Sequence, residues 1–563
     1  MTTNPSNVDN VVNCQLNDFV SKIISLGIIY IYDKMAGALM QIVAYGAQDL
    51  FLTGTPEITY WKVSYRRHTN FAMESIEQTF QGQADFGRRV SAVLSRNGDL
   101  AYRTYLQVTL PEISASNAKY ARWLDYVGEQ LISIVEVEIG GQRIDRQYGD
   151  WMHIWNQLTM SSEQQRGYWK MIGHTTQLTY ITDPAFASVA GPCASSGGPA
   201  QVCAPRNALP ETTLYIPLQF WFCKNPGLAL PLIALQYHEV KINLDFRPIG
   251  ECLWAVNSLA GTGDIKATSA YSQSLVAASL YIDYIFLDTD ERRKMAQNPH
   301  EYLIEQLQFT GDESVGSSSN KIKLNFNHPC KELIWVVQPD SNVDYCSSLE
   351  SGETLYKTLG AQPFNYTDAI DALPNCVHAF GSPESVGGTN QFITTAGLFE
   401  MPGAGGFDIT NGVTGSGNDW QGQPFGDGTH LAGVSDAGTF VLAETALDMH
   451  CWGENPVVTA KLQLNGQDRF SEREGSYFDV VQPFQHHTRA PDTGINLYSF
   501  ALRPEEHQPS GSCNFSRIDN ATLQLVLSSG TVGGVSTAKV RVYALSYNVL
   551  RVMSGMAGVA YSN

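Results

Sequence analysis

A tight turn between two strands of alternating polarity occurs twice in this chain of 563 residues. The first copy spans Val135–Arg143 (VEVEIGGQR), and the second spans Lys461–Arg469 (KLQLNGQDR). A period of two places the apolar side chains of each strand on one face and the polar side chains on the other, which is typical of half-buried antiparallel strands. An internal duplication that includes this element would determine the architecture of the whole chain.

Both turns contain residue types that tolerate positive φ angles. The four structural turn residues are Gly140, Gly141, Asn465 and Gly466. A two-residue primed turn needs positive φ at both central positions, where most side chains would clash with the backbone. The sequence therefore predicts an antiparallel hairpin at both places.

Other segments repeat in the same order on either side of the hairpin. The segments of the first copy and their loose counterparts in the second are Arg89–Leu94 with Lys321–Phe326, Tyr105–Leu110 with Leu333–Gln338, Leu214–Phe222 with Ile495–Leu502, Ala234–Leu244 with Ala521–Leu527, and Leu280–Leu287 with Val540–Leu550. Ordered elements with a matched turn are harder to obtain by chance than one similar strand. The pattern predicts two copies of one all-β unit, each of about 250 residues.

Composition favours the same fold class. The chain contains 49 glycines and 25 prolines, and only 16% of its residues are charged. Helical runs free of glycine, proline and β-branched residues are scarce. Many short strands with frequent turn residues are typical of sandwiches and jelly rolls. We therefore predict an all-β chain with two tandem eight-stranded jelly-roll β-sandwiches and long loop insertions.

Local shifts in composition suggest the domain boundaries. The charged run Asp288–Lys294 is predicted to be the inter-domain linker, because it follows the last strand of the first copy. The expected division is 1–56 for an N-terminal arm, 57–293 for the first jelly roll, 294–552 for the second and 553–563 for a C-terminal tail. Ser195–Pro199 and the glycine-rich stretch Gly397–Gly438 belong to insertions, and such loops usually form exposed surface.

The first 34 residues differ from the rest of the chain. The apolar stretch Phe19–Tyr32 is shorter than the roughly 20 residues that a membrane-spanning helix needs. Met1–Asn10 lacks the basic region of a signal peptide. A packing arm, a membrane-surface segment and a start codon upstream of the usual one at Met35 all remain open.

The formal net charge of -19 argues against nucleic acid as a direct partner, because neutralising phosphates requires clustered lysine and arginine. No zinc-like spacing of cysteine and histidine occurs, and no GxSxG elbow is present. His486 and His487 are adjacent, so on a strand they would face opposite sides and could not chelate one metal ion. No catalytic residue, cofactor site or metal site is predicted, and the chain is not expected to be an enzyme.

Several longer motifs resemble one viral protein family. They include TPEITYWKVSYRRHTNFAMESIEQTF, EVEIGGQRID, NPGLALPLIALQYHEVK, YIFLDTDERRKMAQNPHEYLIEQLQFTG, LNGQDRF, PSGSCNFSRIDNATL and YNVLRVMSGMAGVAY. The chain is similar in these motifs to the major capsid proteins of nucleocytoplasmic large DNA viruses, of the chlorovirus and iridovirus type. The resemblance covers nearly everything from Met35 to Asn563 and is weakest at about 172–206 and 359–444.

The resemblance implies a structural role. Members of the family fold as two consecutive jelly rolls, and three chains form a pseudo-hexameric capsomer that tiles an icosahedral shell around an internal membrane and double-stranded DNA. The partners that it implies are the chain itself as a homotrimer, neighbouring capsomers, and minor capsid, cement and penton proteins. The implied location is the outer capsid shell of the virion, assembled in the host cytoplasm. Ala36–Thr53 is expected beneath the first jelly roll, facing neighbouring capsomers or the membrane side.

Two further sets of residues are candidates for contacts and modification. The candidate inter-subunit contacts are Pro226, Gly227, Leu228, Leu230 and Leu232. A loop that exposes three leucines would need a partner to cover it, although core packing within the chain is an equally good interpretation. Among three sequons, Asn365 is the best candidate for glycosylation, because Asn514 and Asn520 lie before and on a predicted strand.

Two rival classes of protein are also considered. A carbohydrate-binding or spike-like jelly roll would use aromatic loop residues such as Trp420 and Phe425. A cupin-like enzyme would need a clustered metal site, which the placement of histidine and cysteine does not provide.

Overall fold

The computed structural model describes residues 36–44, 46–114, 116–118, 120–179, 209–257, 265–346, 349, 360–369 and 453–562. The chain divides between Thr69 and Asn70 into an N-terminal unit and a main body. The N-terminal unit contains α3 (Ala36–Val43) and α4 (Leu50–Thr53), followed by an extended stretch without regular secondary structure. Phe51 and Trp61 in this unit are each 96% exposed.

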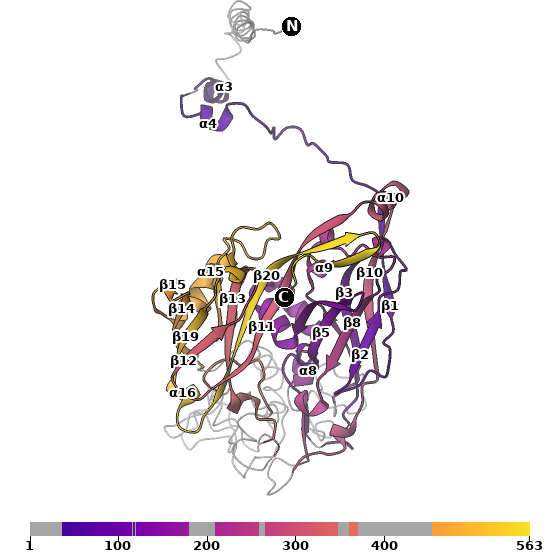
Figure 1. Ribbon diagram of the computed structural model, residues 1–563, viewed down its shortest axis with the longest axis vertical. Helices are drawn as coiled ribbons and strands as arrows, with labels where there is room; N and C mark the ends of the chain where they lie inside the picture. Colours follow the sequence, from indigo (N-terminus) through magenta and orange to yellow (C-terminus); the bar gives the residue numbers. More distant parts are fainter. Residues whose placement is uncertain are drawn as a thin grey trace, which may run out of the picture. The chain divides into compact units, whose positions relative to one another are not determined.

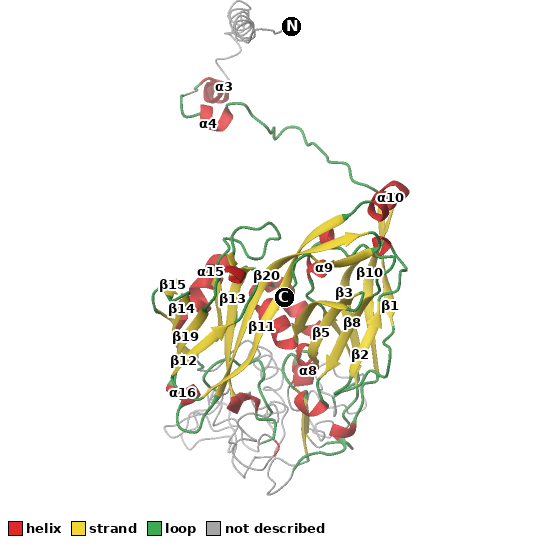
Figure 2. Cartoon of the chain, viewed as in Figure 1, coloured by secondary structure: helices red, strands yellow, loops and turns green. Residues whose placement is uncertain are grey.

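The first sandwich of the main body consists of two four-stranded antiparallel sheets, with orders β1-β10-β3-β7 and β2-β8-β5-β6 (Figures 1 and 2). The strands are β1 (Phe71–Gln78), β2 (Arg89–Val93), β3 (Leu100–Leu110), β5 (Ile132–Ile139), β6 (Gln142–Tyr148), β7 (Thr212–Pro217), β8 (Val240–Phe246) and β10 (Ala277–Leu287). A separate pair is formed by β4 (Tyr120–Trp123) and β9 (Leu253–Val256). The first strand begins later than the expected boundary at residue 57, because the preceding residues are extended and exposed.

The second sandwich is built from sheets with the main orders β11-β20-β13-β17 and β12-β19-β14-β15. The strands are β11 (His300–Val315), β12 (Ser319–Leu324), β13 (Pro329–Pro339), β14 (Val457–Leu464), β15 (Gln467–Asp468), β17 (Ile495–Ser499), β19 (Ala521–Leu527) and β20 (Ala538–Met553). Three short strands extend these sheets, namely β16 (Arg473–Glu474), β18 (Cys513–Asn514) and β21 (Met556–Val559). Since β21 pairs with β20, the expected tail at 553–563 partly belongs to the sheet.

The two sandwiches share one topology. When the eight main strands of each are numbered in chain order, both have sheets of order 1-8-3-6 and 2-7-4-5. The segments matched in the sequence fall on equivalent strands, from β2 with β12 to β10 with β20. The predicted internal duplication and the tandem jelly-roll fold are therefore confirmed.

The hairpin at the centre of the duplication forms in both halves. Gly140 and Gly141 have φ angles of 59° and 83°, and Asn465 and Gly466 have φ angles of 50° and 80°. A Cβ atom at Gly140 would lie 2.6 Å from the ring of His238, so this turn also needs glycine for space. The turns connect β5 to β6 and β14 to β15.

Short helices fill the connections between strands. They are α5 (Val127–Leu131), α6 (Gly149–Thr159), α7 (Ser162–Ile172), α8 (Thr176–Thr179), α9 (Trp221–Lys224), α10 (Thr289–Gln297), α15 (Gln482–His486) and α16 (Ser529–Val532). The single-turn helices are η3 (Pro226–Leu228), η4 (Leu232–Ala234), η5 (Ile249–Glu251), η6 (Ala270–Ser272), η7 (Asp340–Val343), η11 (Tyr477–Val481) and η12 (Phe515–Arg517). The charged linker forms α10, whose start is capped by the carboxylate of Asp288 at 2.7 Å from the Thr289 amide, so the expected boundary at 293 lies inside a helix.

Each sandwich has its own apolar core between its two sheets. Alternation is clean on β8 and β19, where the inward residues are buried and the outward residues are half-buried. The inward residues of the first core include Leu106, Val135 and Ile282, and those of the second include Leu333, Leu462 and Val542. The strand pattern in the sequence thus positions two separate cores within one body.

Candidate functional site at the seam between the two sandwiches

Helices α6 and α7 of the first sandwich cover the outer face of the β11-β20-β13-β17 sheet of the second. We call this contact the seam. Helix α6 carries Trp151, Ile154, Trp155 and Leu158 at spacings of three and four residues, which places all four on one face. The sheet residues in the same buried cluster are Ile334, Val336, Ile495, Leu497, Tyr543 and Leu545.

Aromatic rings dominate the apolar part of the seam. The ring of Trp151 lies 5.5 Å from that of Tyr543 on β20 and 5.7 Å from that of Trp155. Tyr543 also stacks on Phe309 of β11 at 4.8 Å. Burying a large apolar side chain contributes about 1.5–3 kcal/mol, so this cluster fixes the two sandwiches firmly to each other.

A buried ion pair crosses the seam beside these rings. Asp150, at the start of α6, lies 2.5 Å from the Nη1 atom of Arg541 on β20 and 3.5 Å from Arg247 of its own sandwich. Arg541 also pairs with Asp312 at 3.0 Å. Burial alone would lower the pKa of Arg541, but Asp150 and neighbouring groups outweigh it and raise this pKa above its ordinary value. The arginine therefore stays charged and holds both sandwiches.

Trp155 is the centre of a second polar group at the seam. The ammonium of Lys224 lies 3.8 Å above its ring, and that of Lys331 lies 5.7 Å away. Both lysines also pair with Glu305 on β11, at 3.6 Å and 2.5 Å. Burial would raise the pKa of Glu305, but the two lysines lower it below its ordinary value. Lys224 comes from the first sandwich and Glu305 from the second, so this pair also joins them.

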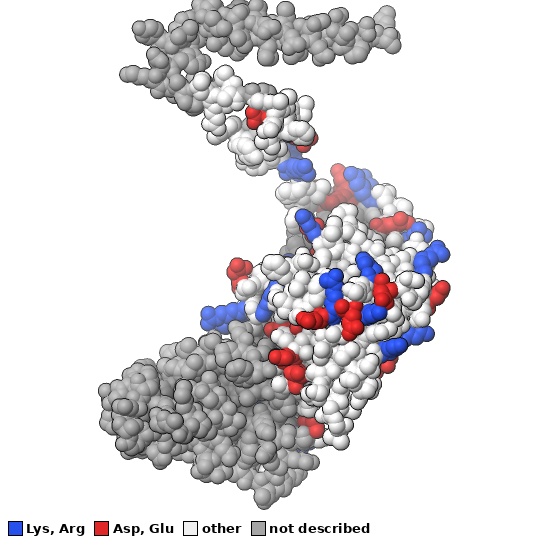
Figure 3. Space-filling view, turned by 90° about the vertical axis from the view of Figure 1, so that its left-hand side faces the viewer, with Lys and Arg blue, Asp and Glu red and all other residues white. Residues whose placement is uncertain are grey.

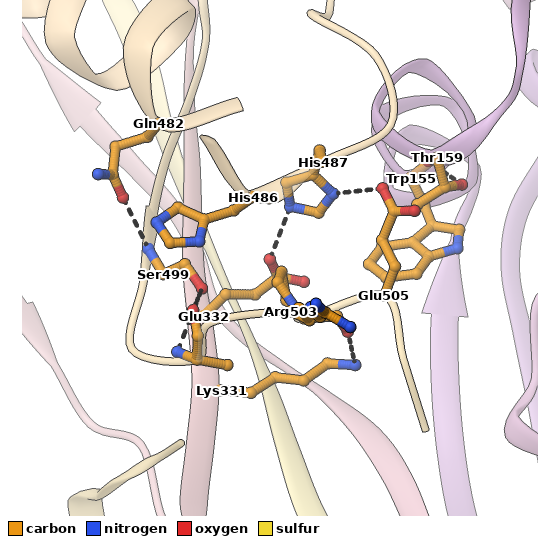
Figure 4. A network of polar contacts seen from close by, with 12 residues as sticks. Trp155, Thr159, Lys331, Glu332, Gln482, His486, His487, Ser499, Arg503 and Glu505 are labelled. Atoms are coloured by element: carbon orange, nitrogen blue, oxygen red, sulfur yellow. Dashed lines mark hydrogen bonds and ion pairs between the residues drawn. The ribbon is translucent and has the colours of Figure 1, made fainter. Parts of the chain in front are cut away.

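His487 lies between two carboxylates at the edge of the same region (Figure 4). Its Nε2 atom is 3.0 Å from Glu332, and its Nδ1 atom is 3.0 Å from Glu505. The imidazole meets the ring of Trp155 edge-on at 6.3 Å between centroids. Burial would lower the pKa of His487, but Glu332 and Glu505 outweigh it and raise the pKa to about 9. The imidazolium is therefore charged at neutral pH and neutralises the buried carboxylate of Glu332.

Asp145 on β6 is a buried carboxylate that is held by hydrogen bonds. It accepts hydrogen bonds from the Leu307 amide of β11 at 3.1 Å, the Arg146 amide at 3.0 Å and the Gln147 side chain at 3.2 Å. Burial raises its pKa to about 7, although these hydrogen bonds act in the opposite direction. Asp145 lines a polar cavity of about 470 Å³ between β6 and β11. Its charge therefore changes near neutral pH at the point where the two sandwiches meet.

Glu129 forms a buried polar cluster that resembles an enzyme site in its residue types. Its carboxylate lies 2.8 Å from His153, 2.6 Å from the Tyr168 hydroxyl and 3.0 Å from the Asn156 amide. The cavity that these four residues help to line has only about 10 Å³ of free space, which is too little for a substrate. The cluster fixes α5, α6 and α7 to one another.

The structure decides between the two interpretations of the loop at 226–232. Leu228, Leu230 and Leu232 are buried in the core of the first sandwich, so of the two interpretations of this loop, core packing within the chain is the correct one. Leu230 exchanges backbone hydrogen bonds with Ala101 at 2.8 and 2.9 Å, which draws the loop under the sheet. Pro226 and Gly227 are exposed and stay candidates for contacts.

Asn365 is a poor glycan acceptor in this structure. It is only 5% exposed, and its Nδ2 atom donates to Gln362 at 2.8 Å and to the Ala369 carbonyl at 2.9 Å. Its Oδ1 atom accepts from the amide and hydroxyl of Thr367. A sugar on this nitrogen would break the buried turn, so the proposed glycosylation is corrected on steric grounds.

The seam residues were not singled out in the sequence. The spacing of apolar residues in GDWMHIWNQLT was a usable signal for an amphipathic helix. The sequence suggests no role for His487 other than metal binding, and the adjacent position of His486 argues against that role. Ser195–Pro199, Gly397–Gly438, Trp420 and Phe425 lie outside the described residues. Among the described residues, no group of three or more histidine, cysteine, aspartate and glutamate side chains could hold a metal ion, and no helix is long and apolar enough to cross a membrane.

Comparison with known proteins places the fold in a family. The family described as "Large eukaryotic DNA virus major capsid protein" matches residues 291–558, and "Major capsid protein N-terminus" matches residues 59–288. The major capsid protein of Phaeocystis pouchetii virus is 76% identical over 94% of this chain and 100% of its own length. That of Chrysochromulina ericina virus is 68% identical with the same coverage. These families and relatives are structural capsid proteins and not enzymes.

A solved structure agrees with these relatives. A quasi-atomic model of the PBCV-1 virus capsid matches with a TM-score of 0.58 and 32% identity, covering 90% of this chain and 100% of that chain. The resemblance seen in the sequence motifs is therefore confirmed.

Proposed function

The chain belongs to the family of large eukaryotic DNA virus major capsid proteins, and from that premise we propose that three copies form a pseudo-hexameric capsomer. Such capsomers would tile the icosahedral shell of a large double-stranded DNA virus. The chain is thus a structural protein of the virion shell, and its mechanism is association between surfaces instead of turnover of a substrate.

The observation that carries this proposal is the shared topology of the two sandwiches. Both have the strand orders 1-8-3-6 and 2-7-4-5, so one chain presents two similar bodies side by side. Three such chains supply six similar bodies, which can occupy a site surrounded by six neighbours. The buried seam supports the proposal, because its rings and ion pairs hold the two bodies at a fixed angle.

We propose a head-to-tail arrangement of the three copies, because the two sandwiches of one chain present different surfaces. In such an arrangement one surface of each copy binds a different surface of the next, and closure at three copies stops further growth. Stable obligate interfaces commonly bury on the order of 2,000–5,000 Å². Contacts between capsomers can be individually weaker, because each capsomer touches several neighbours at once.

The N-terminal unit is proposed to contact other components of the shell. Its exposed apolar side chains include Phe51, Tyr60 and Trp61, and apolar surface of this kind usually binds a partner. The partners proposed for it are neighbouring capsomers, minor capsid, cement and penton proteins, and the side of the shell that faces an internal membrane. Assembly is proposed to occur in the host cytoplasm.

Light scattering of the purified chain after size-exclusion chromatography tests the proposal. The expected mass is three times that of the chain, and negative-stain images should show particles with a hexagonal outline. A monomer or a dimer over the whole accessible range of concentration would contradict the proposed homotrimer.

A further inference from the structure

Equivalent sheets of the two sandwiches differ in how far their outer faces are covered. On β13, β20 and β17 of the second sandwich, the paired residues Ile334, Tyr543 and Leu497 are all buried by the helices of the seam. An outward-facing paired row on the equivalent strands β3, β10 and β7 of the first sandwich consists of Tyr105, Tyr281 and Pro217, and all three are only half-buried. The first sandwich thus leaves open a face that the second has closed.

Three tyrosine rings lie next to one another on this open face. Tyr105 and Tyr281 stack with 5.7 Å between ring centroids and 5° between planes, and Tyr215 lies 6.3 Å from Tyr105. Tyr215 is 40% exposed. We call Tyr105, Tyr215 and Tyr281 the tyrosine face. The hydroxyl of tyrosine can contact water while its ring is buried on binding. Tyrosine therefore suits a surface that is exposed to solvent before assembly and buried afterwards.

The second sandwich contains a counterpart of the helix that closes the seam. Helix α6 lies in the connection from β6 to β7, the fifth and sixth main strands of the first sandwich. The equivalent connection in the second sandwich, from β15 to β17, contains η11 and α15. Phe478 anchors this segment in the second core, while Val480, Val481 and Phe484 point into solvent. Phe484 is 83% exposed, which is costly for a large aromatic side chain without a partner.

A charged residue lies beside each of the two apolar surfaces, Arg473 in the second sandwich and Glu77 in the first. Figure 3 shows the side of the body that lies on the left in Figure 1, where lysine and arginine side chains lie among aspartate and glutamate side chains with uncharged surface between them. Next to the exposed apolar residues, Arg473 lies 4.2 Å over the ring of Tyr477. The tyrosine face is bordered by the exposed carboxylate of Glu77, which sits opposite Tyr281 in the strand register.

We propose that the apolar surface of Val480, Val481 and Phe484 in one copy docks on the tyrosine face of the next copy. This inference rests on the proposed homotrimer and names the surfaces that close it. The occupant is a second copy because the same pair of structural elements already binds within one chain, where α6 covers the equivalent sheet. The new contact also continues the seam, since His487 at the end of α15 touches Trp155 of α6. The ring would then repeat one kind of contact six times, three within chains and three between them.

Glutamate substitutions on either side test the docking. Phe484→Glu and Tyr281→Glu place a charge in the proposed contact, so each should weaken trimer formation on the order of tenfold or more in sedimentation or light-scattering titrations. Val535→Glu is the matched control, because Val535 is 100% exposed and lies between α16 and β20. Equal melting temperatures of the wild-type and variant monomers would show that folding is unaffected.

A mixture of the two variants tests the head-to-tail direction. Each variant keeps one intact surface, so Phe484→Glu and Tyr281→Glu chains should form one-to-one dimers that cannot close into trimers. Trimers of either variant as stable as the wild type, or a mixture that stays monomeric at the highest soluble concentration, would overturn the inference. A wild-type chain that is itself monomeric would instead refute the proposed trimer.

Discussion

Equivalent sheets of the two sandwiches differ in one respect. The outer face of the β11-β20-β13-β17 sheet is covered within the chain, and we call it the closed face; the outer face of the β1-β10-β3-β7 sheet is open. The closed face is covered within the chain and carries Ile334, Leu497 and Tyr543, which never need to meet water. The open face carries tyrosines in a half-buried row. The covered row thus combines two aliphatic residues with one fully buried tyrosine, whereas the open face has tyrosines that stay partly in contact with solvent. The predictions below alter the closed face or residues beside it, and the substitutions Phe484→Glu and Tyr281→Glu described above test the open face.

The largest effect is expected from Trp151→Ala at the closed face. Trp151 is fully buried between α6 and β20, and removing a buried tryptophan side chain costs about 3–5 kcal/mol. Chemical denaturation followed by circular dichroism should therefore show a clearly lower free energy of unfolding. Trp61→Ala is the matched control, because Trp61 is 96% exposed in the N-terminal unit. Equal losses in the two variants would refute the structural role of the seam.

A smaller loss is expected from Arg541→Ala. It leaves the Asp150 carboxylate at the seam with only the more distant Arg247, and breaking a buried ion pair of this kind costs about 3 kcal/mol. Arg551→Ala on the same strand provides the control, because its pair with Glu301 is exposed on both sides. Exposed pairs contribute about 0–1 kcal/mol, so thermal melts of the two variants should separate clearly.

The hairpins, the strand order and the duplication could be predicted from the sequence because alternation and turn residues are local signals. The seam could not, because Trp151 meets a strand that begins almost four hundred residues later in the chain. Nothing in the apolar spacing of α6 says which sheet it will cover. Only the resemblance to a family suggested that two sandwiches would act as one body.

Two short motifs do not reveal that their segments are buried, namely the leucine loop at 228–232 and the sequon at Asn365. The leucines at 228–232 follow proline and glycine, so the sequence is compatible with both an exposed loop and core packing, and backbone hydrogen bonds between Leu230 and Ala101 place them under the first sheet. Asn365 matches a sequon, but Gln362, Thr367 and Ala369 occupy its amide group within a buried turn. Burial of a loop depends on tertiary contacts that short motifs do not encode.

Loss of the proton from His487 at alkaline pH should lower the stability of the folded chain. The pKa of His487 in the folded chain, about 9, lies above its ordinary value of 6.5. The imidazolium therefore contributes its full stabilisation below about pH 6.5 and loses it as the pH rises through about 9. Melting temperatures of the wild type should fall across this window, and those of His487→Gln should fall less. Parallel pH profiles for the two proteins would contradict the assignment.

Asp145 should produce a second pH effect, in a lower range of pH. Its pKa in the folded chain, about 7, lies above its ordinary value of 3.8, so the folded state binds this proton more tightly than the unfolded state. The stability that it contributes is complete below about pH 4 and declines as the pH rises to about 7. Asp145→Asn cannot ionise and should flatten this part of the profile. An unchanged slope between pH 4 and 7 would show that Asp145 does not titrate there.

A three-dimensional reconstruction of the purified assembly by electron cryomicroscopy tests the central claim most directly. We expect three chains arranged head to tail, with η11 and α15 of each copy seated on the tyrosine face of the next. Six similar sandwiches should then surround one axis. A two-fold dimer, or a trimer in which Tyr105, Tyr215 and Tyr281 remain open to solvent, would contradict this account.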